Sequence, residues 1–129
     1  LHRNTLQIAV VNYESAWRLE KELLSFDADI IICDEAHKIK ENRTSQSKAM
    51  HHLGDKARYK LLLTGTLIIN KEIDVFSQYR FLNSEIFGTS FYIFRNRYFD
   101  MCGYGNHIPV FKKQMMNDFL QKTQTINKW

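Results

Sequence analysis

The chain has 129 residues, of which 44% are hydrophobic, 13% aromatic and 25% charged. This length suits one compact domain or a part of a larger protein, and the apolar content excludes a disordered chain. The formal net charge of +4 permits a polyanionic partner without requiring one. No apolar run approaches the roughly 18 residues of a membrane span, so we expect no membrane partner.

The cysteines and the start of the chain indicate a compartment. Cys33 and Cys102 form no CxxC pair, which is typical of proteins from a reducing environment. The chain shows no secretory signal and does not begin with Met. We therefore expect a cytoplasmic protein and a part of a longer chain.

Residues 5–34 read as strand, helix and strand. Apolar residues bunch within 5–13, which predicts a strand covered on both faces. Apolar residues then recur every three or four positions over 15–26, which predicts an amphipathic helix with Ser15 in position to cap it. The wholly apolar run within 29–34, which ends in acid, predicts a central parallel strand.

The next stretch repeats this alternation. A helix is expected to begin at Thr44 or Ser45 and to end near Gly54, a residue suited to a left-handed terminator. A further strand is expected over 59–64. Strands that alternate with helices pair in parallel through crossover connections, so the pattern predicts an α/β layered domain.

Beyond Asn70 the period becomes helical. Apolar stripes over 75–82, 91–98 and 115–120 predict three helices. The single proline and two glycines fall within 102–110, which predicts a long loop. The C-terminal half is therefore expected to be helical.

Residues 91–99 mix aromatic and basic side chains, a composition that also suits nucleic-acid contact. Phe91, Phe94 and Tyr98 fall on one side of the predicted helix. We therefore favour a packed aromatic face with two solvated arginines over a DNA contact.

The acid pair Asp34-Glu35 follows a predicted buried strand, at the edge where parallel sheets bind ligands. An Asp in this place suits a hydrated magnesium ion, and the next carboxylate suits a water in line with a phosphoryl group. An isolated acid pair is more often a solvated strand end. A second signal is needed to favour the catalytic interpretation.

That second signal is the string TGT at 64–66, after the apolar run at 61–63. The string DEAH at 34–37, after IIIC at 30–33, resembles the Walker B segment of DEAH-box ATPases. The TGT string resembles the motif that follows Walker B in helicase superfamily two. Both strings occur in the expected order, each after a strand, and together they favour function.

Further matches narrow the resemblance to the Swi/Snf-type family of helicase-like ATPases. They are the basic extension at 38–40, the string NYE at 12–14, Asn70, and the stretch from Phe81 to Phe91. The resemblance covers at least Ile8 to Tyr98. It implies a DNA-dependent ATPase that uses ATP and Mg²⁺ and translocates along double-stranded DNA, and we expect a bacterial or phage-encoded protein.

The resemblance also implies roles for single residues. Asp34 would bind magnesium through water, and Glu35 would activate the attacking water. The residues that would couple the nucleotide to DNA and to the partner lobe are His37, Thr64, Gly65 and Thr66. One departure is Leu67, which stands where the family usually has Pro and predicts a looser loop.

The implied fold is a partial RecA-like (P-loop NTPase) three-layer domain with a parallel sheet over 1–70. An α-helical extension of the same lobe would follow over 71–129. Phosphate binding in this class needs a Gly-Lys-Ser/Thr loop, and the sequence contains no Gly-Lys pair. We therefore expect the isolated chain to be inactive without the missing N-terminal part of the lobe and the second RecA-like lobe.

The same topology would leave the strand at 59–63 with an uncovered edge, which predicts self-association of the chain. An alternative to the enzyme is a non-catalytic DNA-binding or protein-interaction module with a degenerate nucleotide site. A third alternative is another superfamily-two enzyme, which the stretch after Asn70 disfavours.

Overall fold

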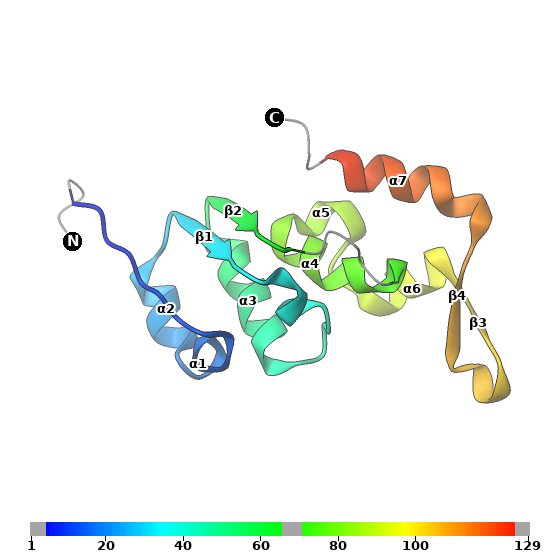
Figure 1. Cartoon of the computed structure of the whole chain (residues 1–129), viewed down its shortest axis with the longest axis horizontal. Coiled ribbons are helices and arrows are strands. Elements are labelled where there is room, and N and C mark those ends of the chain that lie inside the picture. Colours follow the sequence, from blue (N-terminus) through cyan, green and yellow to red (C-terminus); the bar gives the residue numbers. More distant parts are fainter. Residues whose placement is uncertain (1–4, 66–70, 126–129) are drawn as a thin grey trace.

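The computed structural model describes residues 5–65 and 71–125 (Figure 1). Its helices are α1 (Tyr13–Arg18), α2 (Glu20–Phe26), α3 (Ser45–Lys56), α4 (Val75–Leu82), α5 (Ser84–Phe87), α6 (Phe91–Tyr98) and α7 (Met116–Gln124). Its strands are β1 (Ile30–Cys33), β2 (Tyr59–Leu62), β3 (Phe99–Cys102) and β4 (Ile108–Phe111). In this part of the chain no helix is long and apolar enough to cross a membrane.

A parallel pair of strands organises the first half of the fold. Ile30 lies opposite Tyr59 and Cys33 opposite Leu62, and α3 forms the crossover between the strands. The predicted parallel pairing is confirmed. One face of the pair contributes Ile31 and Leu62 to the core, and the fold is a mixed α/β arrangement with a small parallel sheet.

The predicted strand over 5–13 is wrong. Residues 5–12 form no strand, and the side chains of Leu6, Ile8 and Val10 are 88%, 76% and 93% exposed. Apolar, β-branched residues favour an extended backbone, but a strand also needs a neighbouring edge to bond with. The sheet that contains β1 has β2 as its only other strand within the described residues.

The predicted helix over 15–26 is two helices, α1 and α2, which meet at Leu19. The backbone of Leu19 leaves the helical region, with φ −104° and ψ 19°. The cap is also different from the prediction. The Asn12 side chain accepts a hydrogen bond from the Ser15 backbone N–H at 2.7 Å, so Ser15 donates where it was expected to accept.

Gly54 lies inside α3 and does not end it, because the helix continues to Lys56. A Cβ atom at Gly54 would stand 2.7 Å from the Phe81 ring and 2.9 Å from the Phe81 carbonyl oxygen. The absence of a side chain at Gly54 therefore allows α3 and α4 to pack closely. The start of α3 agrees with prediction, since the Thr44 side chain accepts from the Ser47 N–H at 3.2 Å.

The predicted loop over 102–110 is largely an antiparallel hairpin, so the C-terminal half is not wholly helical. Phe99 of β3 lies opposite Phe111 of β4, with an edge-to-face ring contact at 5.4 Å. The turn contains Gly103, Gly105 and Asn106 in left-handed conformations, which close a short connection. The helices predicted over 75–82, 91–98 and 115–120 are confirmed.

Two hydrophobic clusters hold the fold, and α4 contributes to both. The first cluster joins α1, β1 and α3 to Phe81, and its buried members are Ala16, Cys33, Ile39, Met50, Leu53 and Phe81. The second cluster is mostly aromatic, and its buried members are Val75, Phe76, Phe87, Phe94, Tyr98, Phe99 and Phe119.

The aromatic face predicted for residues 91–99 belongs to the second cluster. Phe94 and Tyr98 are both buried there, and Phe91 packs against the same cluster. This burial confirms the packed face that the helical spacing predicted.

A buried polar contact joins α3 to α4. The His51 Nε2 atom lies 3.0 Å from the Ser77 carbonyl oxygen and 3.0 Å from the Ser77 hydroxyl. Burial lowers the pKa of His51 to about 4, and the hydrogen bond with the Ser77 backbone opposes this change by raising the pKa. The ring is therefore neutral in the folded chain at neutral pH.

The lowered pKa of buried His51 predicts a loss of stability in mild acid. Below its ordinary pKa of about 6.5, His51 takes up a proton in the unfolded chain that the folded chain excludes. Between about pH 7 and about pH 5 the free energy of unfolding should fall by about 2 kcal/mol more than in His51→Gln, which does not titrate. Urea unfolding at both pH values measures this difference. Equal slopes for wild type and His51→Gln would contradict the prediction.

Candidate functional site

The carboxyl ends of β1 and β2 bring the two sequence motifs to one edge. The Ala36 N–H donates to the Leu63 carbonyl oxygen at 2.9 Å, and the Leu63 N–H donates to the Cys33 carbonyl oxygen at 2.8 Å. The loop that carries Asp34 and Glu35 is thus bonded to the segment that leads into Thr64 and Gly65. Thr66, Leu67 and Asn70 lie outside the described residues.

The acid pair occupies a sharp turn directly after β1. Asp34 and Glu35 are both exposed, and Asp34 Oδ1 accepts from the Glu35 N–H at 2.9 Å. Glu35 has φ 51° and ψ 55°, a left-handed conformation that costs a non-glycine residue about 1 kcal/mol. Such strained conformations cluster at functional sites. The turn leads into a short 3-10 helix over Ala36–Ile39.

His37 lies beside the acid pair. Its Nδ1 atom is 3.1 Å from Glu35 Oε2, and the side chains of His37 and Glu35 are 47% and 60% exposed. The structure therefore places Asp34, Glu35 and His37 within one solvent-accessible loop next to Thr64.

Two residues for which the sequence predicted no role, Tyr13 and Gln78, bind the backbone of this loop. The Tyr13 hydroxyl donates to the Asp34 carbonyl oxygen at 2.6 Å, and the Gln78 side chain donates to the Ala36 carbonyl oxygen at 3.3 Å. Burial, followed by the neighbouring Cys33, raises the pKa of Tyr13, so its hydroxyl keeps the donated proton. The string at 12–14 pointed to Tyr13, whereas no local pattern indicated Gln78.

Cys33 is a buried neighbour of the site and not a nucleophile. Its side chain is almost fully enclosed, and burial raises the pKa of the thiol to about 12. A thiol with this pKa stays protonated at neutral pH and packs as a small apolar group.

The described residues contain no group of three or more His, Cys, Asp or Glu side chains that would hold a metal ion. Magnesium is usually bound by one or two carboxylates together with waters and substrate phosphates. The exposed Asp34 carboxylate, at the end of a strand, suits this mode of binding. The other ligands would come from water and a phosphate group.

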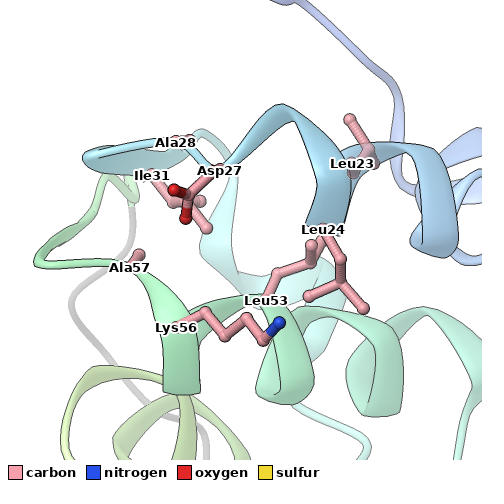
Figure 2. A pocket seen from close by; sticks show the side chains of 8 residues that line it. All are labelled: Leu23, Leu24, Asp27, Ala28, Ile31, Leu53, Lys56 and Ala57. Carbon is pink, nitrogen blue, oxygen red and sulfur yellow. The ribbon is translucent and has the colours of Figure 1, made fainter.

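A small pocket lies away from this edge, between α2, β1 and α3 (Figure 2). Leu24 and Leu53 line its apolar side, and Asp27 and Lys56 contribute its charged groups. Its cavity volume is about 20 Å³, far below the roughly 300 Å³ of the smallest ligand pockets. The pocket is therefore not the candidate site.

Comparison with known proteins identifies relatives. The family described as SNF2-related domain matches residues 2–127. DNA repair and recombination protein RAD54 of Oryza sativa subsp. japonica is 36% identical over 103 residues, which cover 76% of this chain and 10% of that protein. A RAD54-like DNA repair and recombination protein of Drosophila persimilis is 30% identical over 122 residues, covering 94% of this chain and 15% of that protein. No solved structure matches the chain.

These relatives contradict the expected source and cellular location of the protein. The similar proteins come from rice, fruit flies and chicken, and Protein CHROMATIN REMODELING 25 of Arabidopsis thaliana is 33% identical over 97 residues. Those 97 residues cover 74% of this chain and 10% of the Arabidopsis protein. All are eukaryotic proteins, so the expectation of a cytoplasmic, bacterial or phage-encoded protein is wrong.

The chain spans 10% to 15% of the length of these relatives. Its mixed α/β fold, with a small parallel sheet and helices, is compatible with a part of an SNF2 helicase-like domain. The match over residues 2–127 agrees with the resemblance to the Swi/Snf-type family. The chain belongs to the SNF2-related domain family.

Proposed function

We propose that the chain is the C-terminal part of the first RecA-like lobe of a DNA-dependent ATPase of helicase superfamily two, with residues 34–37 as its DEAH box. The observation that carries this proposal is the hydrogen bond from the Ala36 N–H to the Leu63 carbonyl oxygen. It sets the acid pair beside the segment leading to Thr64, at the carboxyl edge of two parallel strands. This edge is where open α/β sheets bind nucleotides.

In this proposal Asp34 holds Mg²⁺ through water, and Glu35 orients and activates the water that attacks the terminal phosphate of ATP. Bound Mg²⁺ neutralises negative charge on the phosphate oxygens. The contact between His37 and Glu35 supports a coupling role for His37. We assign coupling also to Thr64, Gly65 and Thr66.

Tyr13 and Gln78 act as positioning residues, because each donates to a backbone carbonyl of the acid loop. Tyr13 belongs to α1, which precedes the loop in the sequence, and Gln78 belongs to α4, which follows it. A change in the packing of either helix would therefore move the carboxylates.

The proposed site is incomplete without residues outside this chain. The phosphates need a Gly-Lys-Ser/Thr loop, and the sequence contains no Gly-Lys pair. The partners are therefore the remaining part of the lobe, a second lobe and double-stranded DNA, which the DNA repair names of the relatives support. The division at residue 70 and self-association through 59–63 stay predictions.

The test is DNA-stimulated phosphate release from ATP by the full-length protein that contains this chain. Asp34→Ala should lower this rate by about a hundredfold or more, because charge stabilisation in the transition state is lost. Asp29→Ala, at an exposed Asp next to the opposite end of β1, should keep the rate. The isolated chain should release no phosphate.

Two results would contradict the proposal. Normal DNA-stimulated hydrolysis in Asp34→Ala would show that catalysis does not need Asp34, and would favour a non-catalytic DNA-binding or protein-interaction role for this part of the protein. Turnover by the isolated chain would show that the phosphates are held by residues within it.

A further inference from the structure

Successive residues of α4 form hydrogen bonds with three other parts of the fold. Ser77 bonds to His51 of α3 at 3.0 Å, and Arg80 forms a bidentate pair with Asp55 of α3 at 2.6 and 2.9 Å. The two residues between them reach away from α3, one to the acid loop at residues 34–36 and the other to α7. Figure 1 shows α4 near the middle of the molecule, between α3 and the C-terminal helices.

The bond to α7 comes from Tyr79, whose hydroxyl donates to the Thr123 carbonyl oxygen at 2.8 Å. Thr123 lies in the last turn of α7, where carbonyl oxygens have no N–H partner within the helix. Burial raises the pKa of Tyr79, so the hydroxyl keeps the proton that it donates. The ring also packs edge-to-face against Phe87 at 5.4 Å. Tyr79 therefore holds the end of α7 against α4.

The bond to the acid loop comes from Gln78 and holds the residue that follows the acid pair. The Gln78 amide donates to the Ala36 carbonyl oxygen at 3.3 Å, while the Ala36 N–H donates to the Leu63 carbonyl oxygen. These bonds adjoin Glu35, whose left-handed backbone persists in a non-glycine residue only where the surrounding structure holds it. Loss of the Gln78 bond should therefore let the Glu35 carboxylate leave its position.

The Gln78 bond depends closely on the position of α4. At 3.3 Å it is longer than the usual range of about 2.7 to 3.2 Å for N–H···O bonds, so a small displacement of the helix breaks it. The helix has eight residues, about two turns, and its side chains move together when it rotates.

Bonds to α3 and to α7 hold α4 on different faces. Ser77 and Arg80 are three positions apart, so they lie on the same face of the helix and hold it against α3. Tyr79 lies on the far side of the helix and holds it against α7. Without the Tyr79 bond, α4 would be held on one face only and could rotate about that contact.

We propose that Tyr79 is a positioning residue for ATP hydrolysis, which links α7 to the acid loop through α4 and Gln78. This inference rests on the proposed function, in which Glu35 activates the attacking water. Tyr79 does not touch the nucleotide in this proposal. It keeps Gln78 within hydrogen-bonding distance of the Ala36 carbonyl, so the acid loop is fully ordered for hydrolysis only while α7 is bound to α4.

The experiment measures DNA-stimulated phosphate release by the full-length protein that contains this chain, with Tyr79→Phe. This substitution deletes the hydroxyl and keeps the ring that packs against Phe87. We expect kcat to fall about threefold to tenfold, which is the effect of one hydrogen bond of ordinary strength. KM for ATP should not change, because the groups that hold the phosphates lie outside this chain.

Tyr98→Phe is the matched control. The Tyr98 hydroxyl also bonds to α7, through Asp118, but Tyr98 belongs to α6 and not to α4. The two variants thus make the same chemical change, and each removes one bond that holds α7. The control should keep the wild-type kcat, whereas an equal reduction in both variants would overturn the specific role of Tyr79.

A double-mutant cycle with Gln78→Met tests the path to the acid loop, since Met has a similar length but no amide donor. If Tyr79 acts through Gln78, Tyr79→Phe should not lower kcat further in the Gln78→Met protein. An equal fold-reduction in both backgrounds, or a normal kcat in Tyr79→Phe alone, would overturn the proposal. Failure of the proposed function would instead appear as normal hydrolysis in Asp34→Ala, so the two failures are distinguishable.

Discussion

Glu35→Gln in the full-length protein should lower kcat for DNA-stimulated ATP hydrolysis by about 10² to 10⁴. The amide keeps the size and hydrogen-bonding reach of the carboxylate but does not accept a proton from the attacking water. KM for ATP should change little, because binding of the triphosphate depends on residues outside this chain. Steady-state phosphate release at saturating DNA measures both quantities.

Glu41→Gln provides the matched control for this experiment. Glu41 is an exposed carboxylate six positions further along, outside the acid loop, and its substitution removes the same charge. Its kcat should stay within about twofold of wild type, since surface substitutions have small effects. A normal kcat in Glu35→Gln would assign water activation to another group, whereas equal reductions in both variants would indicate a general effect of charge.

Phe94→Ala should lower the free energy of unfolding by about 3 to 5 kcal/mol. Phe94 is 1% exposed, and its ring centre lies 5.1 Å from that of Phe87 and 5.2 Å from that of Phe76. Removing the ring leaves a cavity between α4, α5 and α6 and breaks several aromatic contacts. Since domains of this size are stable by about 5 to 15 kcal/mol, much of the folding margin would be removed.

Ile93→Ala is the control on the same helix. Ile93 is the preceding residue, but its side chain is 67% exposed, so truncation should cost less than about 0.5 kcal/mol. Urea unfolding followed by circular dichroism measures both variants. A decrease below about 1 kcal/mol in Phe94→Ala would show that the aromatic cluster repacks or contributes little to folding.

Elements whose signals are local were predicted from sequence. The apolar run at 30–33 and the one at 59–62 each carry the strand pattern within a few residues, and the helix between them dictates parallel pairing. The cap at Thr44 and the aromatic stripe of α6 are also local, because capping and helical periodicity act over three or four residues.

Elements that depend on a distant partner were missed. The apolar run at 5–12 lacks a strand partner in the described part of the fold, and a sequence does not show which edges are available. Gly54 resembled a helix terminator, but the approach of Phe81 from α4 explains the missing side chain. The sequence predicts a loop over 102–110 because the strands of the hairpin are short and β4 contains Pro109 near a glycine-rich turn.

By itself the sequence determined the family and the residue types of the candidate site, because residue types and their spacing are properties of the chain. The positions of Asp34, Glu35 and Thr64 after apolar runs were enough to place them at strand ends.

Only the tertiary structure decided which atoms hold the acid loop and which ion pairs join the C-terminal helices. The contacts of Tyr13 and Gln78 with that loop span 21 and 42 residues, and the ion pair between Arg97 and Asp118 joins α6 to α7. Contacts of this kind depend on how helices pack in space, and no local periodicity encodes them.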